Sequence, residues 1–490
     1  MRSLARNAVM NGVNQVSGVL LPLIIFPYIS RVLLPDGLGR VQFATSVAAL
    51  FALVAALGIP VYGVRETARV RDNPEGLSRL TVELFSLNVI MTLLSVVAFV
   101  LFMMFSEKAR QDPALFWIIS VAVFTVPFAL DWFFQGLEEF TWIALRSLFF
   151  RLLLLAGVFL FVRNTSDYRI YALLVSLNAA GAAVLNIGFA VRRIELKRIR
   201  WRELNWVRHM KPVLLMFALW AAVGIYTSVD KVMLGYLSND AQVGFYTASD
   251  KIVRVVTGLV SALGMVLFPR LSYHLEKNET EEYGRLAGKF FRILGFFCLP
   301  AAFGLIAVAG PLILLFTGET FMPAVLPLRL MGLNVVMLSL SGFFGLQILY
   351  PQGREKLILR AILIGVAVNI GLNALLIPRM QAVGAAWATL IAETLVVLME
   401  ILFSRRSLYF SWPFGALVRY GLAALVTGIV AAWVTSWFAS TWLQLFSAVF
   451  LGGLFYLICM LTLRDDVLLF LIGKGKSLFR TQLGRRLGLL

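Results

Sequence analysis

The sequence has 490 residues, of which 60% are hydrophobic and only 14% are charged. A soluble domain carries about 25% charged and about 45–50% apolar residues, so a water-soluble protein is excluded and the solvent must be lipid. The formal charge of +18 lies in short segments between apolar stretches, without the aromatic and basic patch that binds single strands. We therefore exclude nucleic acid as a partner.

Apolar stretches recur along the whole chain, and each is long enough to cross a hydrocarbon core of about 30 Å, for which roughly 20 helical residues are needed. They predict an all-α integral membrane protein with about fourteen transmembrane helices. We expect the first stretch to be a helix, because no clear small-residue cleavage site marks it as a signal peptide. The expected spans are 8–29, 41–63, 80–105, 114–135, 141–162, 169–191, 208–230, 241–267, 288–316, 322–350, 357–378, 381–404, 413–438 and 442–463.

The basic residues indicate the direction in which the chain crosses the membrane. Most of the 44 lysine and arginine residues fall on one side when these spans are threaded, including a dense run over 192–211. The positive-inside rule therefore predicts that both termini are cytoplasmic. These loop charges also suit the headgroups of anionic membrane lipids.

An internal repeat divides the chain into halves. Leu38-Gly39 followed by Ala56-Leu57-Gly58 recurs as Val243-Gly244 followed by Ala262-Leu263-Gly264. Six helices per half is an even number, so the repeats are parallel, as in transporters whose site lies between two lobes. The expected division is an N-lobe at 1–195, a basic cytoplasmic linker at 196–210, a C-lobe at 211–404, and an appended helix pair with a basic tail at 405–490.

Six cations fall inside the expected spans, where each costs about 2.5–3.5 kcal/mol at the helix centre. They are Arg146, Arg151, Lys251, Arg254, Arg329 and Arg419. Arg419 is near a span end and can reach the interface. Lys251 and Arg254 are three residues apart, so they share one helix face, and we expect that face to line a wet cavity.

The acids at similar depth are Asp131, Asp250, Glu393 and Glu400. One interpretation pairs Asp131 with Arg146, and Glu393 with Arg254 or Lys251. The other leaves a cavity with excess positive charge, which suits an anion such as a diphosphate. Both interpretations stay open.

Polar side chains on two spans offer a second kind of contact. Asn11, Asn14 and Gln15 on the first span, and Asn369 and Asn373 on the eleventh, could bond sugar hydroxyls or join helices. The two cysteines, Cys298 and Cys459, lie in apolar runs, so neither a disulfide nor a metal site is expected, and no cofactor is predicted.

Several short stretches, taken in order, resemble the Wzx-type polysaccharide flippases of the MATE-like MOP superfamily. The stretches are Phe26-Pro27-Tyr28-Ile29-Ser30-Arg31-Val32-Leu33 with Gly37-Leu38-Gly39, Asp131-Trp132-Phe133-Phe134-Gln135-Gly136, Tyr226-Thr227-Ser228-Val229-Asp230-Lys231-Val232-Met233-Leu234-Gly235, Val243-Gly244-Phe245-Tyr246-Thr247-Ala248-Ser249-Asp250-Lys251, Leu267-Phe268-Pro269-Arg270-Leu271-Ser272, Gly353-Arg354-Glu355-Lys356, Asn369 with Asn373, and Gly384-Ala385-Ala386.

The resemblance implies two six-helix lobes around a cationic central cavity. It also implies a flippase that moves undecaprenyl-diphosphate-linked oligosaccharide, such as O-antigen, across the bacterial inner membrane by alternating access. Implied partners are an H⁺ or Na⁺ coupling ion and the polysaccharide polymerase machinery. The implied residues are the substrate-binding cations Arg31, Arg146, Arg151, Lys251, Arg254 and Arg329, the gating or ion-coupling acids Asp131, Asp230 and Glu393, and the sugar-binding amides Asn14, Asn369 and Asn373.

Rival functions make different demands on the sequence. A multidrug exporter of the same superfamily should have acids dominating its cavity, whereas cations outnumber acids here. A membrane polymerase or glycosyltransferase needs a catalytic acid or metal cluster, but His209 and His274 lie in expected cytoplasmic linkers and no Asp-x-Asp is present. We therefore expect a transporter and not an enzyme. An uncoupled scramblase or assembly scaffold stays open.

Overall fold

The computed structural model describes residues 4–195, 199, 201–265, 268–405, 412–470 and 472. Within these ranges the secondary structure is helical and contains no strand. The elements are α1 (Leu4–Ala56), α2 (Ile59–Val70), α3 (Pro74–Phe105), α4 (Glu107–Gln111), α5 (Pro113–Phe124), η1 (Val126–Phe128), α6 (Asp131–Gly136), α7 (Phe140–Phe161), η2 (Thr165–Asp167), α8 (Tyr168–Ala190), η4 (Trp201–Glu203), α9 (Val207–Leu237), α10 (Asp240–Met265), α11 (Phe268–Glu276), α12 (Thr280–Thr317), η5 (Glu319–Ala324), α13 (Val325–Gly332), α14 (Asn334–Ser341), η6 (Gly342–Leu349), α15 (Glu355–Ser404), α16 (Phe414–Thr435) and α17 (Thr441–Thr462).

The expected transmembrane spans correspond to these helices. Eleven stretches of the described chain are long and apolar enough to cross a bilayer. Two of them hold more than one expected span, because α1 leaves helical geometry at Leu34 (φ 59°) and α15 does so at Gln381 (φ 53°). α10 has 26 residues but is not among the eleven, since its middle carries three charges at 250, 251 and 254. The all-α membrane fold is confirmed, and the arrangement is consistent with about fourteen spans.

The chain forms two compact units. Unit 1 consists of Met1–Thr247 and Ile370–Ala385, and unit 2 consists of Ala248–Asn369 and Ala386–Leu490. α10 and α15 contribute to both units, because the division falls inside them. The lobe and linker boundaries expected from the sequence stay predictions. Residues 196–198 and 200 of the expected linker, position 267 of the quoted motifs and the tail from 473 onward lie outside the described residues.

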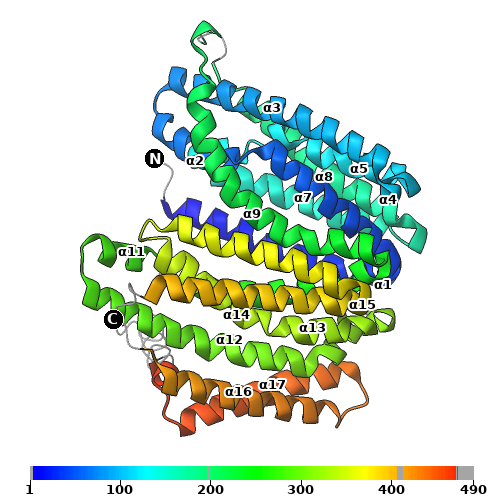
Figure 1. The fold of residues 1–490 in the computed structure, drawn as a ribbon, viewed down its shortest axis with the longest axis vertical. Helices are drawn as coiled ribbons and strands as arrows, with labels where there is room; N and C mark the ends of the chain where they lie inside the picture. Colours follow the sequence, from blue (N-terminus) through cyan, green and yellow to red (C-terminus); the bar gives the residue numbers. More distant parts are fainter. Residues whose placement is uncertain are drawn as a thin grey trace, which may run out of the picture. The chain divides into compact units, whose positions relative to one another are not determined.

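In unit 1, α1 packs against α3, α5, α7 and α9 (Figure 1). Its break brings two backbones into direct contact, because Gly39 lies against the backbone of Asp240 and Gly244 lies against the backbone of Pro35. A Cβ at either glycine would overlap those atoms, so the glycine types are required for this approach. Gly39 and Gly244 are also the two glycines that the sequence repeat matches with each other.

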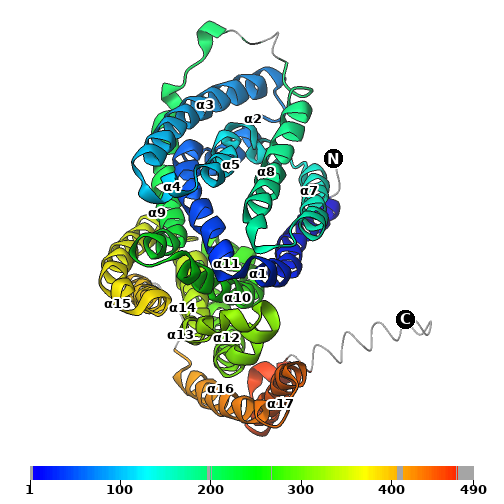
Figure 2. The same cartoon turned by 90° about the vertical axis from the view of Figure 1, so that its right-hand side faces the viewer.

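In unit 2, α12 packs against α13, α14, α16 and α17. Figure 2 shows α16 and α17 side by side next to α12. The Tyr456 hydroxyl donates to the main-chain oxygen of Phe296 on α12 at 3.0 Å, and the Tyr420 hydroxyl donates to Asp465 Oδ2 at 2.7 Å. The first bond fixes the appended helix pair to α12 and the second joins α16 to the segment after α17, and apolar packing adds to both.

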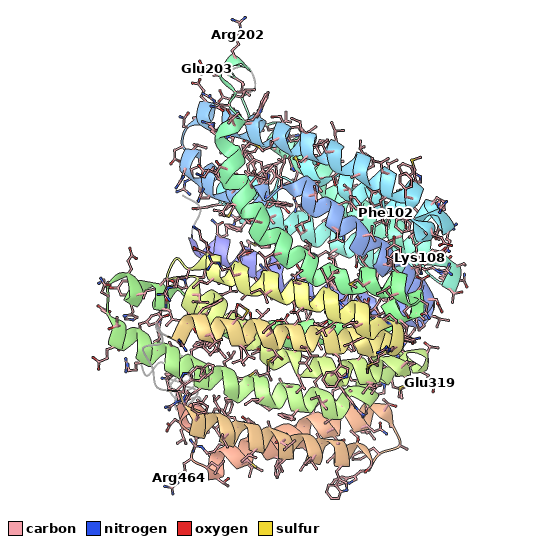
Figure 3. All side chains as sticks on the ribbon, viewed as in Figure 1. Phe102, Lys108, Arg202, Glu203, Glu319 and Arg464 are labelled. Carbon is pink, nitrogen blue, oxygen red and sulfur yellow. The ribbon has the colours of Figure 1, made fainter. Side chains whose placement is uncertain are left out.

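Charged side chains mark the helix ends in each unit. In unit 1, Arg202 and Glu203 lie beyond one end of the helices and Lys108 lies at the other (Figure 3). In unit 2, Arg464 and Glu319 lie at opposite ends. Exposed apolar side chains cover the intervening helix surfaces, among them Leu93, Val97 and Phe450. Large apolar surface between charged ends is what a membrane-spanning bundle presents to lipid.

Candidate functional site

Arg146 on α7 and Asp131 at the start of α6 form an ion pair. Arg146 is buried, and its Nη1 lies 2.8 Å from Asp131 Oδ1. Asn186 on α8 accepts a hydrogen bond from Arg146 and donates to the main-chain oxygen of Ala129. The Asp131 side chain is 46% exposed, so the cluster runs from a buried guanidinium to an accessible carboxylate. This is the pairing that the sequence offered as the alternative to anion binding.

Arg151 lies five residues further along α7 and is held by neutral oxygens. Its Nη1 donates to the main-chain oxygen of Asn14 at 2.8 Å and to Ser17 Oγ at 2.7 Å, both on α1. In the described part of the chain no acid forms an ion pair with Arg151, and the nearby charges are those of Arg146 and Asp131. α7 therefore carries two arginines, and only Arg146 has an acid as its ion-pair partner among the described residues. This leaves one positive charge in excess on the helix.

Asp230 on α9 is a buried carboxylate that accepts hydrogen bonds from Tyr246 and Asn373. The Tyr246 hydroxyl on α10 donates to its Oδ2 at 2.5 Å, and Asn373 Nδ2 on α15 donates to its Oδ1 at 2.6 Å. All three side chains are buried. The structure thus brings together one predicted ion-coupling acid and one predicted sugar-binding amide, which are 143 residues apart in sequence.

The cations of α10 beyond residue 247 belong to unit 2. Arg254 Nε donates to Asp250 Oδ1 at 2.8 Å, one helical turn earlier. The Arg254 side chain is 51% exposed and that of Asp250 is 8% exposed. The i,i+4 spacing of an acid and a base is a recognised helix pairing, so the sequence held a signal for this contact that was not used. Lys251 is partly buried on the same helix.

The remaining predicted site residues are distributed between the units. Arg31 on α1 and Arg329 on α13 have exposed side chains. Glu393 on α15 is buried, as is Asn369 on the same helix. Asn14 contacts Arg151 through its main-chain oxygen, while its side-chain Oδ1 is buried without a hydrogen-bond partner among the described residues.

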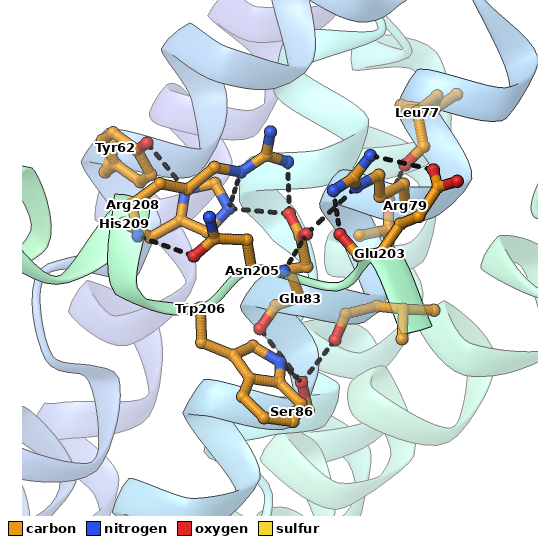
Figure 4. A network of polar contacts seen from close by, with 12 residues as sticks. Tyr62, Leu77, Arg79, Glu83, Ser86, Glu203, Asn205, Trp206, Arg208 and His209 are labelled. Atoms are coloured by element: carbon orange, nitrogen blue, oxygen red, sulfur yellow. Dashed lines mark hydrogen bonds and ion pairs between the residues drawn. The ribbon is translucent and has the colours of Figure 1, made fainter. Parts of the chain in front are cut away.

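A buried acid, Glu83 on α3, organises a network that the sequence analysis missed (Figure 4). Its carboxylate accepts from the main-chain nitrogen of Asn205 at 2.7 Å, from Arg79 Nε at 3.2 Å and from the Arg208 guanidinium. His209 Nε2 lies 2.9 Å from Glu83 Oε2, and its Nδ1 lies 2.8 Å from the Tyr62 hydroxyl. The network fastens the segment before α9 to α2 and α3. Only the Arg79–Glu83 spacing was visible in the sequence.

A second polar cluster lies at the Lys108 end of unit 1. Lys108 Nζ lies 2.6 Å from Asp240 Oδ1, and Arg40 Nε lies 3.5 Å from Asp240 Oδ2. These residues line a cavity of about 190 Å³ together with aromatic and polar side chains. The lining consists of Arg40, Phe43, Lys108, Gln111, Asp112, Leu115, Phe116 and Asp240.

In the part of the chain that the structure describes, no group of three histidine, cysteine, aspartate or glutamate residues is arranged to hold a metal ion. Cys298 and Cys459 are free thiols.

Comparison with known proteins identifies the family. The model of the polysaccharide biosynthesis protein family matches residues 4–274. A relative in Escherichia coli K12, named "Putative O-antigen transporter", is 23% identical over 83% of this chain and 97% of its own. "Probable lipid II flippase MurJ" of Rhizobium tropici is 26% identical over 63% of this chain and 60% of its own. "Probable flippase AglR" of Haloferax volcanii is 24% identical over 45% of each chain.

Solved structures show the same fold. The lipid II flippase MurJ in an inward closed conformation superposes with a TM-score of 0.76, at 16% identity, over 94% of this chain and all of its own. An inward-facing MATE family transporter of the MOP superfamily superposes with a TM-score of 0.61, at 15% identity, over 82% of this chain and 95% of its own. The chain is thus a multi-pass membrane protein with the fold of these transporters. Since the family model covers more than half of its length, the chain belongs to the polysaccharide biosynthesis protein family.

Proposed function

We propose that this protein is a flippase for an undecaprenyl-diphosphate-linked oligosaccharide. It moves the diphosphate and its sugars from the cytoplasmic to the outer leaflet of the bacterial inner membrane, with both termini in the cytoplasm. Family membership and the flippase and O-antigen transporter names of the relatives support this assignment. The excess of basic residues on one side of the expected spans supports the orientation.

The observation that carries the proposal is the excess positive charge on α7. Arg151 is held by Asn14 and Ser17 through neutral oxygens, while Asp131 pairs with Arg146. A cation kept at membrane depth without an acid of its own is costly, so a functional reason is expected. Arginine stays charged and binds phosphate oxygens in pairs, which suits a diphosphate headgroup.

The other predicted cations extend this role to the rest of the chain. We assign diphosphate or sugar contacts to Arg31, Lys251, Arg254 and Arg329 as well. The half-exposed guanidinium of Arg254, anchored by Asp250, supports this for unit 2. Asn14, Asn369 and Asn373 remain proposed sugar contacts, although the bond from Asn373 to Asp230 also suits a role in positioning that acid.

The acids are assigned to gating and ion coupling. Asp131 has an accessible carboxylate beside a buried arginine, so a substrate phosphate can compete for Arg146 as the acid is displaced. Asp230 and Glu393 are buried, where a change of charge strongly alters the local energy. Moving one elementary charge across the membrane is worth about 2.3 kcal/mol per 100 mV, so an H⁺ or Na⁺ gradient or the membrane potential drives alternating access. Delivery of the product to polysaccharide polymerase machinery completes the proposed role.

The test is the flipping of a fluorescent undecaprenyl-diphosphate oligosaccharide in proteoliposomes, with Arg151→Gln compared with Arg419→Gln. Arg419 is the matched control, because it is exposed near the start of α16 and, among the described residues, its Nε donates to the main chain of its own helix at Gly415. We expect the wild type and Arg419→Gln to flip alike and Arg151→Gln to lose at least about tenfold in rate, which corresponds to about 1.4 kcal/mol.

Two results would contradict parts of the proposal. If the wild type moves no lipid-linked oligosaccharide but exports small cations, the substrate assignment is wrong and the exporter alternative replaces it. If Arg151→Gln and Arg419→Gln flip equally well, the flippase assignment stands and the role of the excess charge on α7 is wrong.

A further inference from the structure

Glu400 is a buried acid that none of the roles above uses. It lies on α15, four residues before the helix ends at Ser404, and its side chain is 1% exposed. Ser341, the last residue of α14, makes a side-chain hydrogen bond to it. Gly345 of the π-helix η6 lies opposite, and a Cβ added there would stand 2.7 Å from Glu400 Oε1. The carboxyl group therefore occupies space that the glycine leaves open.

The charges around Glu400 do not favour a carboxylate. α14 and η6, which supply Ser341 and Gly345, contain no charged residue. Glu393, two turns earlier on α15, is the charged group that acts on it, and its sign is the same. Within the part of the chain that the structure describes, Oε2 is buried without a hydrogen-bond partner and no cation pairs with either oxygen. Arg405, just beyond α15, has an exposed side chain.

These surroundings determine whether the Glu400 side chain is ionised or protonated. Burial without a partner cation penalises an ionised carboxylate far more than a neutral carboxyl group, so a buried acid in such surroundings takes up a proton. The nearby negative charge of Glu393 acts in the same direction. A serine hydroxyl can bond to a neutral carboxyl group, since both can donate and accept.

We propose that Glu400 is a proton-binding site of this transporter, neutral in the conformation described and able to exchange its proton during transport. Binding joins one H⁺ from water to the carboxylate, and release returns it, so no other reactant is needed. Glu400 lies one turn from the end of α15. The distribution of loop charges assigns this end of the helix to the cytoplasm, so the proton would exchange on the cytoplasmic side. The claim of a bound proton is independent of the substrate, whereas its coupling to transport rests on the proposed function.

Infrared difference spectroscopy of the full-length protein at neutral pH tests the bound proton. An exposed glutamate with a pKa of about 4.3 is ionised there and absorbs as a carboxylate. We expect the wild-type minus Glu400→Gln spectrum to contain the C=O band of a protonated carboxyl group. Glu282→Gln is the control, because Glu282 is exposed and paired with Arg285, and it should remove a carboxylate band instead. If Glu400→Gln also removes only a carboxylate band, the proposal is wrong.

Labelling with the apolar reagent dicyclohexylcarbodiimide gives a second readout. The O–H of a protonated carboxyl group adds across one C=N bond of the reagent and the adduct rearranges to an acylurea, with no leaving group. Peptide mass spectrometry should find the adduct on Glu400 at neutral pH and less of it at alkaline pH. It should find none on Asp466, whose side chain is 82% exposed. An adduct on Asp466 but not on Glu400 would contradict the proposal.

Transport under a pH gradient tests the coupling separately. We expect Glu400→Gln, which mimics the neutral acid, to keep its fold and its flipping without a gradient but to lose stimulation by a gradient. Stimulation that survives in Glu400→Gln would remove the coupling claim. A wild type that flips nothing while the infrared band is present would overturn the proposed function and leave the proton site in place.

Discussion

Replacing Glu83 by alanine perturbs the network that ties the segment before α9 to α2 and α3. The carboxylate is completely buried and receives bonds from Arg79, Asn205, Arg208 and His209. Its removal deprives every one of these donors of its shared acceptor at once. The change therefore acts on the connection between helices and not on one side-chain contact.

The loss in the free energy of unfolding depends on which of these donors water can reach after Glu83 is removed. Arg79 and Arg208 are 32% and 45% exposed, so solvent can replace much of what they lose. His209 is buried and keeps its contacts with Tyr62 and with Arg208 Nε. Breaking a buried ion pair costs about 3–5 kcal/mol, and we expect the lower end because the two arginines are partly solvated. The free energy of unfolding should therefore fall by about 3 kcal/mol.

Unfolding in mixed detergent micelles measures this difference, with Glu66→Ala as the control. Glu66 on α2 pairs with Arg65 and Arg69, whose side chains are more than half exposed, so its loss should cost less than about 1 kcal/mol. Glu83→Ala should also speed tryptic cleavage at Arg202, because the nearby Asn205 main chain loses its acceptor. Equal stability losses in the two variants, with unchanged cleavage, would refute the reasoning.

Two further variants probe contacts inside unit 1. Gly39→Ala should lower the free energy of unfolding by about 1–3 kcal/mol, because the added methyl group overlaps the Asp240 backbone. Gly188→Ala, with open space at that position, should cost nothing, and comparable losses would show that the close approach is absent. In a double-mutant cycle of Asp230→Ala and Asn373→Ala, we expect a coupling energy of about 1.5–3 kcal/mol, as for a hydrogen bond to a charged group. Additive effects would exclude that bond.

The sequence predicts the fold well because every segment that crosses the lipid bilayer must be a long apolar helix. Each span needs enough apolar residues, so hydropathy locates most helices to within a few residues. It does not predict how the connections are made, since α1 and α15 continue through single-residue breaks where short loops were expected. The break at Leu34 depends on the following Pro35, which restricts the residue before it, and on contacts that only the folded chain provides.

The sequence indicates which residues belong to the candidate site better than it indicates which contacts those residues make with one another. The Asp131–Arg146 contact was foreseen as one of two alternatives, because depth alone suggested it. The Asp230–Asn373 bond and the Glu83 network join residues more than 100 positions apart, and hydropathy contains no information on how two helices are rotated against each other. Which cations touch substrate stays a prediction for the same reason.

The breaks at Leu34 and Gln381 decide where a reporter can be inserted to map topology. Neither break has a loop, and the residues that follow, such as Leu38 and Ala382, are buried. An epitope tag placed there would have to unwind two helices and displace a packed backbone, so failure to express would say nothing about sidedness. The exposed turn at Ala439, between α16 and α17, has room for a tag on the side that the charge distribution assigns to the exterior.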